Sequence, residues 1–580
     1  MAGNDAPSSG GLVGPIPTTV SLASCPALEA KSILPPVRVF RSTSVENLNS
    51  TPKDRAYWRA KSLRRLFSMR EPEEDLEGSA RLPIVEESIE CLRRNDYGGY
   101  TIPAHNLYPF QWNWDSAIVA AGWAVFDEAR AWEEFEKLFS GQWEDGMVPS
   151  IIFHRPSTSY FPGPEIWGSP AAPSESTGIT QPPVASVSAR FLFEHTEHAE
   201  LAEEQMADLF PKLLASHRWW YKARDPEKKG IVAILHPWES GMDNSPAWDA
   251  ALQFPVDNLP PYERKDLQHV NACMRPTKET YDHYLTLLYR FKAENYYDSN
   301  KLYWVSPFRM TDLCTNSILF RANRDLRWLA IKLGKTDVVA EIDEWLERGF
   351  EGFKQLWDED AGLFKCQDQL TGKLDDAATS AAFLPLFAGV ASKEQAAKLA
   401  ENLKQWLDKV PFGVPSTDPR DPRFEPLRYW RGPVWIIINW MIFNGLRHYG
   451  YDDLAQRIYD DSVALTSNAG LREYFDPQTG DGAGVGALVR QFTRNCRILR
   501  NAISRDQPPK IDAINAYVLK NFRTGDKLFM SLLRCYIDDK VEASCVIPAA
   551  QPRLAAPVTI VQMPPVPMTN TEVLGSKSRV

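Results

Sequence analysis

The chain has 580 residues, of which 44% are hydrophobic and 24% are charged, a composition typical of a globular protein with a large core. Its formal charge of −10 excludes the clustered basic surface by which proteins bind nucleic acids or anionic membranes. We therefore expect a small or neutral ligand, and neither nucleic acid nor a membrane as partner.

The eight cysteines are scattered, without a Cys-x-x-Cys pair or a histidine spacing that would form a zinc site. Reduced thiols and no metal are expected. The sequence has no apolar run of about 18 residues that would predict a transmembrane helix, and its N-terminus lacks the pattern of a secretory signal. Residues 1–41 weakly resemble a transit peptide, so the cytoplasm is the favoured location and an organelle is the alternative.

The N-terminal part differs from the middle of the chain. Residues 1–52 mix Ser, Pro, Gly and Thr without apolar periodicity, which predicts a disordered tail because such a segment buries too little surface to offset its ordering entropy. Residues 53–83 begin with helical spacing and a basic face over 53–70, and we expect a peripheral helix and linker there.

Residues 84–486 form one predicted helical domain. Strand signals are few, apart from a short β-like piece at 148–153, and there is no βαβ series. The helix pairs, joined by loops rich in Pro, Gly, Trp and Asp, predict an all-α barrel of concentric helical hairpins. Apolar residues recur at helical spacing over 115–138, 184–198, 200–223, 277–294, 316–334, 338–357, 392–409, 434–449 and 452–466.

Aromatic rings cluster ahead of the first of these helices. Tyr108–Ser116 contains four rings within seven residues and ends in Asp115-Ser116. Asp115 as a helix N-cap would explain the carboxylate but not the exposed rings. An aspartate beside tryptophan also suits a hexose, because the carboxylate accepts hydrogen bonds from hydroxyls while the ring covers a C–H face. A helix cap and a sugar site are therefore both open.

Two acids compete for one role in Trp238–Pro246, namely Glu239 and Asp243. Gly241 favours a tight turn that would expose Asp243. Asp-Asn-Ser-Pro is also a common turn sequence, so a purely structural turn is the alternative.

A third acid, Glu473, follows Arg472 in what we interpret as a loop ending at Pro477. Taken alone, a salt bridge with Arg472 or another arginine explains it. Together with Asp243 it fits glycoside hydrolysis, in which one carboxylic acid protonates the leaving oxygen and another carboxylate directs water.

Other motifs carry less information. Tyr429–Trp435 leads into the helix over 434–449, where Pro433 suits the first turn, and its rings fit either the core or a cleft. Asp358–Gly362 is interpreted as a turn, not a calcium loop. Gly480–Gly486 lacks the preceding strand and following lysine of a phosphate loop.

On five ordered motifs the chain resembles glycoside hydrolase family 63, and within it the mannosylglycerate and glucosylglycerate hydrolases, over residues 96–486. The resemblance implies an (α/α)6 barrel and an inverting mechanism that requires neither metal nor cofactor. The motifs are Tyr-x-x-x-Trp-x-Trp-Asp-Ser from Tyr108, Trp-Glu-Ser-Gly-Met-Asp-Asn-Ser-Pro from Trp238, Arg-Pro-Thr from Arg275, Tyr-Trp-Arg-Gly-Pro-x-Trp from Tyr429 and Glu-Tyr-Phe-Asp-Pro from Glu473.

The resemblance also implies residue roles, with Asp243 as general acid and Glu473 as general base. Arg275 suits a glycerate carboxylate, because its planar guanidinium can bind both oxygens. Inversion needs the two carboxyl groups about 6.5–9.5 Å apart, and the acid must keep its proton near neutrality, for which Trp238 and Met242 offer apolar surroundings. The substrate-binding residues implied are Tyr108, Trp112, Trp114, Asp115, Tyr160, Gln181, Gly241, Arg275, Tyr429 and Trp430.

The chain departs from the family after Gly486. Relatives continue into an aromatic final helix of Phe-Ser-Trp type, whereas this chain reads Ala-Leu-Val-Arg-Gln-Phe-Thr-Arg. We expect residues 487–545 to be a divergent C-terminal segment, arising from altered splicing or a shifted reading frame, and residues 546–580 to be a disordered tail rich in Pro, Ala and Val. The last barrel helix would then be lost or replaced.

These features favour an inverting α-glycosidase acting on a small α-glycoside such as mannosylglycerate or glucosylglycerate. One alternative is an oligosaccharide α-glucosidase of the same family, against which the lack of a secretory signal argues. Another is a catalytically impaired sugar-binding or scaffold protein, which the altered C-terminus motivates. A homo-oligomer is compatible with the sequence.

Overall fold

The computed structural model describes residues 83–105, 107–169, 173–296 and 299–486, so the expectations for 1–52, 487–545 and 546–580, and for nearly all of 53–83, lie outside the described residues. The described helices are α2 (Pro83–Arg94), α3 (Asn113–Trp123), α4 (Glu128–Ser140), α5 (Pro164–Trp167), α6 (Ala185–Glu194), α7 (Ala199–Arg224), α8 (Lys278–Ala293), α9 (Ser299–Val305), α10 (Leu313–Lys332), α11 (Val339–Lys354), α12 (Leu384–Ala388), α13 (Lys393–Leu407), α14 (Ile436–Tyr449) and α15 (Asp452–Ala469).

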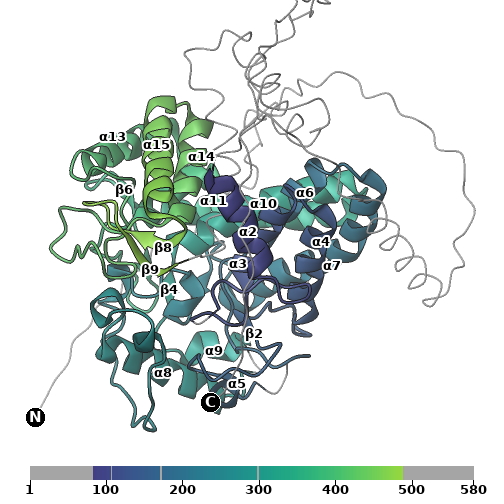
Figure 1. The fold of residues 1–580 in the computed structure, drawn as a ribbon, viewed down its shortest axis with the longest axis horizontal. Coiled ribbons are helices and arrows are strands. Elements are labelled where there is room, and N and C mark those ends of the chain that lie inside the picture. Colours follow the sequence, from purple (N-terminus) through teal and green to yellow (C-terminus); the bar gives the residue numbers. More distant parts are fainter. Residues whose placement is uncertain (1–82, 106, 170–172, 297–298, 487–580) are drawn as a thin grey trace, which may run out of the picture. The chain divides into compact units, whose positions relative to one another are not determined.

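The helices are nested in two layers (Figure 1). Helices α3, α6, α10, α12 and α14 contact one another in that succession, and α4, α7, α11 and α15 each pack on the inner helix next to them in the chain. Every residue of α3 and of α12 is buried, whereas α4 and α11 bury one side only, as expected for inner and outer helices of a barrel. The fold is the predicted all-α (α/α)6 barrel.

The first predicted helix is wrong in its extent. Residues 115–138 belong to two helices, because the chain turns after Trp123 and Asp127 starts α4 by accepting a 3.1 Å hydrogen bond from the Arg130 amide. Asp115 is also not an N-cap: α3 begins at Asn113, directly after Trp112, which is the N-cap residue. Asp115 therefore lies inside the first turn of α3.

Short antiparallel strands join the loops between the helices. They are β1 (Gln111–Trp112) with β2 (Ile151–Ile152), β3 (Ala233–Ile234) with β4 (Met310–Thr311) and β7 (Gln367–Asp368), β5 (Trp357–Asp358) with β6 (Leu363–Phe364), and β8 (Arg472–Phe475) with β9 (Gly482–Gly486). Glu473 thus lies on a strand and not in the predicted loop. The glycine-rich segment that follows it forms the second arm of a hairpin.

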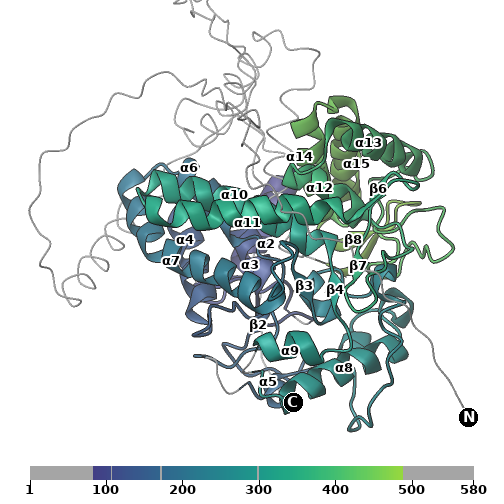
Figure 2. The same ribbon diagram turned by 180° about the vertical axis from the view of Figure 1, so that it is seen from behind.

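Helices α5, α8 and α9 gather at one end of the described domain. In both Figure 1 and Figure 2 they lie at the lower end, while α6, α10 and α11 lie above β2 and β4. Helix α14 begins at Ile436, so Pro433 precedes it instead of occupying its first turn. Among the described residues, no helix is long and apolar enough to span a bilayer.

Candidate active site

A cavity lies among the loops that join the helices, and most of the sequence-predicted site residues line it. Trp430 and Glu473 do not line it directly: Trp430 stacks on Trp435 with ring centroids 3.8 Å apart, and Glu473 lies behind Tyr108. The predicted residues that do line the cavity are Tyr108, Trp112, Trp114, Asp115, Tyr160, Gln181, Gly241, Asp243, Arg275 and Tyr429.

Aromatic rings meet at right angles in the wall of the cavity. Trp112 meets Tyr108 edge-on, with ring centroids 5.4 Å apart, and meets Tyr160 in the same way at 5.3 Å. Gly241 has a φ of +69°, and an added Cβ there would come within 2.8 Å of the Trp114 ring, so this position requires glycine. The wall offers flat apolar surface of the kind that packs on sugar C–H faces.

Glu134 of α4, which is fully buried, holds the segment around Gln111 and Ser116 in place. Its carboxylate accepts hydrogen bonds from the Thr101 amide at 3.2 Å and from the side chains of Ser116 at 2.5 Å and Gln111 at 3.2 Å. Arg130 neutralises it at 2.9 Å. This network sets the position of the segment around Trp112 and Asp115 against the outer helix.

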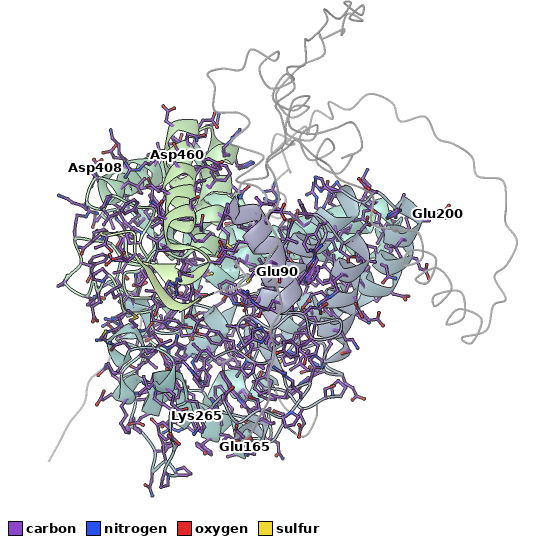
Figure 3. The ribbon with its side chains drawn as sticks, viewed as in Figure 1. Glu90, Glu165, Glu200, Lys265, Asp408 and Asp460 are labelled. Carbon is purple, nitrogen blue, oxygen red and sulfur yellow. The ribbon has the colours of Figure 1, made fainter. Side chains whose placement is uncertain are left out.

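Two loops meet at the edge of the cavity. The ring of Phe161, which lines the cavity, stacks on Tyr262 with a centroid separation of 5.4 Å and an interplanar angle of 5°. Glu165 of α5 and Lys265, both labelled near the lower edge of Figure 3, follow these two rings in the chain. The stacked pair therefore joins segments about 100 residues apart at one side of the cavity.

Asp243 is partly buried and lines the cavity, in the loop after the short 3₁₀ helix Pro237–Ser240. Two buried rings fix the backbone of this loop. The Tyr284 hydroxyl donates to the Asp243 carbonyl at 2.6 Å, and the Trp248 indole donates to the Met242 carbonyl at 2.9 Å. The carboxyl group is thus presented to the cavity from an anchored turn.

Glu239, the competing acid, has a structural role. It is fully buried and pairs with Arg224 at 2.7 Å, while its second oxygen accepts a 2.8 Å hydrogen bond from the Leu235 amide. Of the two acids that the sequence left open, Asp243 lines the cavity and Glu239 does not.

His236 supports the same loop as a neutral imidazole. Burial lowers the pKa of His236 to about 3. Its Nδ1 accepts a 3.0 Å hydrogen bond from the Trp238 amide, so Nε2 carries the proton and donates to the Tyr284 carbonyl at 3.0 Å.

Glu473 on β8 is fully buried and surrounded by donors. Oε1 accepts a 2.5 Å hydrogen bond from the Tyr108 hydroxyl, Oε2 accepts one from the Val485 amide at 3.1 Å, and Arg275 Nη1 lies 3.6 Å from Oε1. The ion pair considered from the sequence exists, but its arginine is Arg275, since Arg472 Nε donates to a backbone carbonyl instead.

Tyr108 connects Glu473 to the rest of the site. Burial raises the pKa of Tyr108 well above its ordinary value, so its hydroxyl keeps its proton and donates to Glu473. The same oxygen accepts a 3.1 Å hydrogen bond from Arg275 Nη1 and lies 3.2 Å from the Tyr429 hydroxyl. Asp243 and Glu473 thus flank one group of rings, with Asp243 at the cavity and Glu473 behind Tyr108.

Sequence reasoning missed Asp266, which lines the cavity and holds Arg275. Asp266 Oδ2 accepts from Arg275 Nε at 3.1 Å and from Arg264 Nη2 at 2.6 Å. The Arg275 guanidinium also lies 4.0 Å from the centroid of the Tyr429 ring. Nothing in the loop sequence around Asp266 distinguishes it from other surface acids. Trp167, Trp238 and Tyr281 line the cavity as well.

Tyr429 lies in a strained backbone conformation, with a φ of +40° for a residue that is not glycine. Two hydrogen bonds hold it: the Trp435 indole donates to the Tyr429 carbonyl at 2.8 Å, and the Trp430 amide donates to Asn244 Oδ1 at 2.9 Å. Asn244 follows Asp243, so this hydrogen bond joins the loop that carries Asp243 to the aromatic segment at Tyr429 and Trp430.

Among the described residues, no group of three or more His, Cys, Asp or Glu side chains is arranged to hold a metal ion.

Comparison with known proteins identifies the family. A family model described as the mannosylglycerate hydrolase MGH1-like glycoside hydrolase domain matches residues 108–493. Mannosylglycerate hydrolase MGH1 of Selaginella moellendorffii is 60% identical over 405 residues, which cover 70% of this chain and 83% of that protein. Glucosylglycerate hydrolase of Mycolicibacterium hassiacum is 33% identical over 420 residues, covering 69% and 94%.

The structural comparison agrees. The crystal structure of the family 63 mannosylglycerate hydrolase from Thermus thermophilus, in complex with Tris and D-glycerate, matches with a TM-score of 0.69 and 50% identity over 71% of this chain and 98% of that chain. The chain therefore belongs to the mannosylglycerate hydrolase MGH1-like enzymes of glycoside hydrolase family 63.

Proposed function

We propose that this glycoside hydrolase cleaves an α-glycoside of glycerate, mannosylglycerate or glucosylglycerate, with inversion at the anomeric carbon. Asp243 is the general acid that protonates the leaving oxygen, and Glu473 is the general base that removes a proton from the attacking water. The observation that carries the proposal is that Asp243 lines the cavity, while the buried Glu473 accepts a hydrogen bond from Tyr108, which lines the same cavity. Relatives named for both glycerate glycosides support the substrate class.

The cavity suits a small substrate with one sugar and a charged aglycone. Trp112 and Tyr160 offer apolar surface for the sugar, while Asp115 is placed to accept hydrogen bonds from hydroxyl groups. Arg275 supplies the cation for a carboxylate and is oriented by Asp266. The D-glycerate in the complex of the Thermus thermophilus relative supports a glycerate aglycone.

An NMR time course with mannosylglycerate, glucosylglycerate and trehalose tests the proposal. Consumption of a glycerate glycoside with the β-anomer released first is expected. Release of the α-anomer first would contradict inversion, and turnover of trehalose alone would contradict the substrate class.

Asp243→Asn should lower kcat by on the order of 10²–10⁴-fold. Asp249→Asn is the control, since Asp249 pairs with Arg431 at 2.8 Å and does not line the cavity. Equal rates for both variants would remove Asp243 from the mechanism.

A further inference from the structure

The hairpin β8–β9 has an irregular register opposite Glu473. Arg472 pairs with Gly486 and Tyr474 pairs with Ala483, so two steps along β8 correspond to three steps along β9. Gly484 and Val485 of β9 therefore lie opposite the single residue Glu473. This is the arrangement of a β-bulge, and Gly484 has the left-handed backbone, with a φ of +68°, that glycine adopts at the first position of one bulge type.

The bulge contacts the carboxylate of Glu473 through both of its residues. The Val485 amide donates a 3.1 Å hydrogen bond to Glu473 Oε2, a side-chain acceptor, instead of to the strand ladder. Gly484 leaves the space that the glutamate fills: an added Cβ would meet Oε2 directly and would lie 2.7 Å from both Glu473 Cβ and Tyr474 Cε1. Real Cβ atoms do not approach other atoms this closely, so the glutamate side chain would have to move.

We propose that Gly484 and Val485 form a positioning element that fixes the orientation of the Glu473 carboxylate for its reaction with water. The inference rests on the proposed function, because it assigns Glu473 as the general base. Neither residue lines the cavity, so both act through Glu473 and not on the sugar. In this proposal the glycine-rich segment Gly480–Gly486, which lacks the following lysine of a phosphate loop, contributes to catalysis.

The Tyr108 hydroxyl and the Val485 amide hold the two oxygens of Glu473 from different parts of the chain. A carboxylate fixed at both oxygens has little freedom to rotate, and a misplacement of about 1 Å at a reacting group can cost about 100-fold in rate. A side chain at position 484 would cause such a displacement. Neither Trp112 nor Tyr160 supplies any of the three atoms nearest to the added Cβ, which belong to Glu473 and Tyr474.

Gly484→Ala tests the proposal, with Gly480→Ala as a matched control in the same hairpin. Gly480 also has a left-handed backbone, at +80°, but a Cβ there would meet only the Phe412 ring, at 3.1 Å. Both variants place alanine in a left-handed backbone, so both should lower Tm, and Gly484→Ala should lower it more because its Cβ also displaces Glu473 and Tyr474. Gly484→Ala should lower kcat by about 100-fold with KM changed less than about 3-fold, whereas Gly480→Ala should keep kcat within about 3-fold of wild type. Equal kcat for the two variants would overturn the inference.

Gly484→Asn and Gly480→Asn keep the Cβ contacts but lower the backbone strain, because asparagine tolerates a left-handed backbone, and they replace the alanine pair if backbone strain prevents Gly484→Ala from folding. Glu473→Gln distinguishes a failure of this inference from a failure of the proposed function. Wild-type turnover by Glu473→Gln would overturn the proposed function. If Glu473→Gln is inactive, adding Gly484→Ala should leave its sugar affinity unchanged, and a loss of affinity would show that Gly484 acts on the sugar wall instead.

Discussion

The two acidic residues of the site differ in burial and in the contacts around them. Asp243 is partly exposed to the cavity, and its loop is fixed through backbone carbonyls, with Tyr284 donating to that of Asp243 and Trp248 to that of Met242. Glu473 is fully buried, and the contacts reach its carboxylate itself through Tyr108 and Val485.

Under the proposed mechanism, this difference corresponds to the two roles of the acids. A proton donor needs a carboxyl group facing the substrate among apolar rings, whereas a proton acceptor needs a carboxylate held by donors in one orientation. Supports of Asp243 should therefore affect stability and loop position, and supports of Glu473 should affect turnover. The following predictions test this comparison, beginning with the largest effect.

Glu239→Gln should cause the largest loss of stability, because it leaves the buried Arg224 without its counter-charge in the loop that carries Asp243. Removing one partner of a buried pair costs about 3–5 kcal/mol. Urea unfolding measures this loss. Glu341→Gln is the control, since its ion pair with Arg218 is exposed and should contribute less than about 1 kcal/mol. Equal losses of unfolding free energy in the two variants would show that the loop carrying Asp243 does not depend on the Arg224–Glu239 ion pair.

Tyr108→Phe and Tyr284→Phe compare the two supports directly, since each removes one hydroxyl that donates to an acid of the site. Tyr108 donates to the Glu473 carboxylate at 2.5 Å and Tyr284 to the Asp243 backbone at 2.6 Å. We expect kcat to fall by about 10–100-fold in Tyr108→Phe and by less than about 5-fold in Tyr284→Phe. The reverse order in a steady-state assay would refute the contrast between carboxylate and backbone support.

His236→Asn should make stability less dependent on pH. The pKa of His236 lies at about 3 in the folded protein, below the ordinary 6.5, so the unfolded chain takes up the proton first as pH falls. This contribution to stability is present above pH 6.5 and is lost as pH falls toward 3. Asparagine keeps an acceptor for the Trp238 amide but does not titrate. Between about pH 6.5 and 4.5 the wild type should lose about 2 kcal/mol more than the variant; parallel curves would contradict this.

Long amphipathic helices could be predicted from sequence alone. Predicted helices at 277–294 and 452–466 correspond to α8 and α15, because both helices keep one apolar side. Helix α12 was not predicted. All five of its residues are buried, so it has no polar side to give a period.

The candidate site could be predicted only in part. Motifs and family resemblance named Asp243 and Glu473, but the strand that carries Glu473 was not predicted because its partner strand is mostly glycine, which gives no strand signal. Asp266 was missed because its contact with Arg275 depends on the course of an irregular loop. Contacts of that kind have no local sequence period.

The hydrogen bond from Tyr108 to Glu473 joins residues 365 positions apart. During synthesis the first of these side chains leaves the ribosome long before the second exists, so no partly made chain can contain the assembled site. Turnover of substrate would therefore require that the β8–β9 hairpin has been synthesised and that it has folded against the segment around Tyr108. Two co-expressed fragments divided at any loop between these positions would have to reassociate before they could consume substrate.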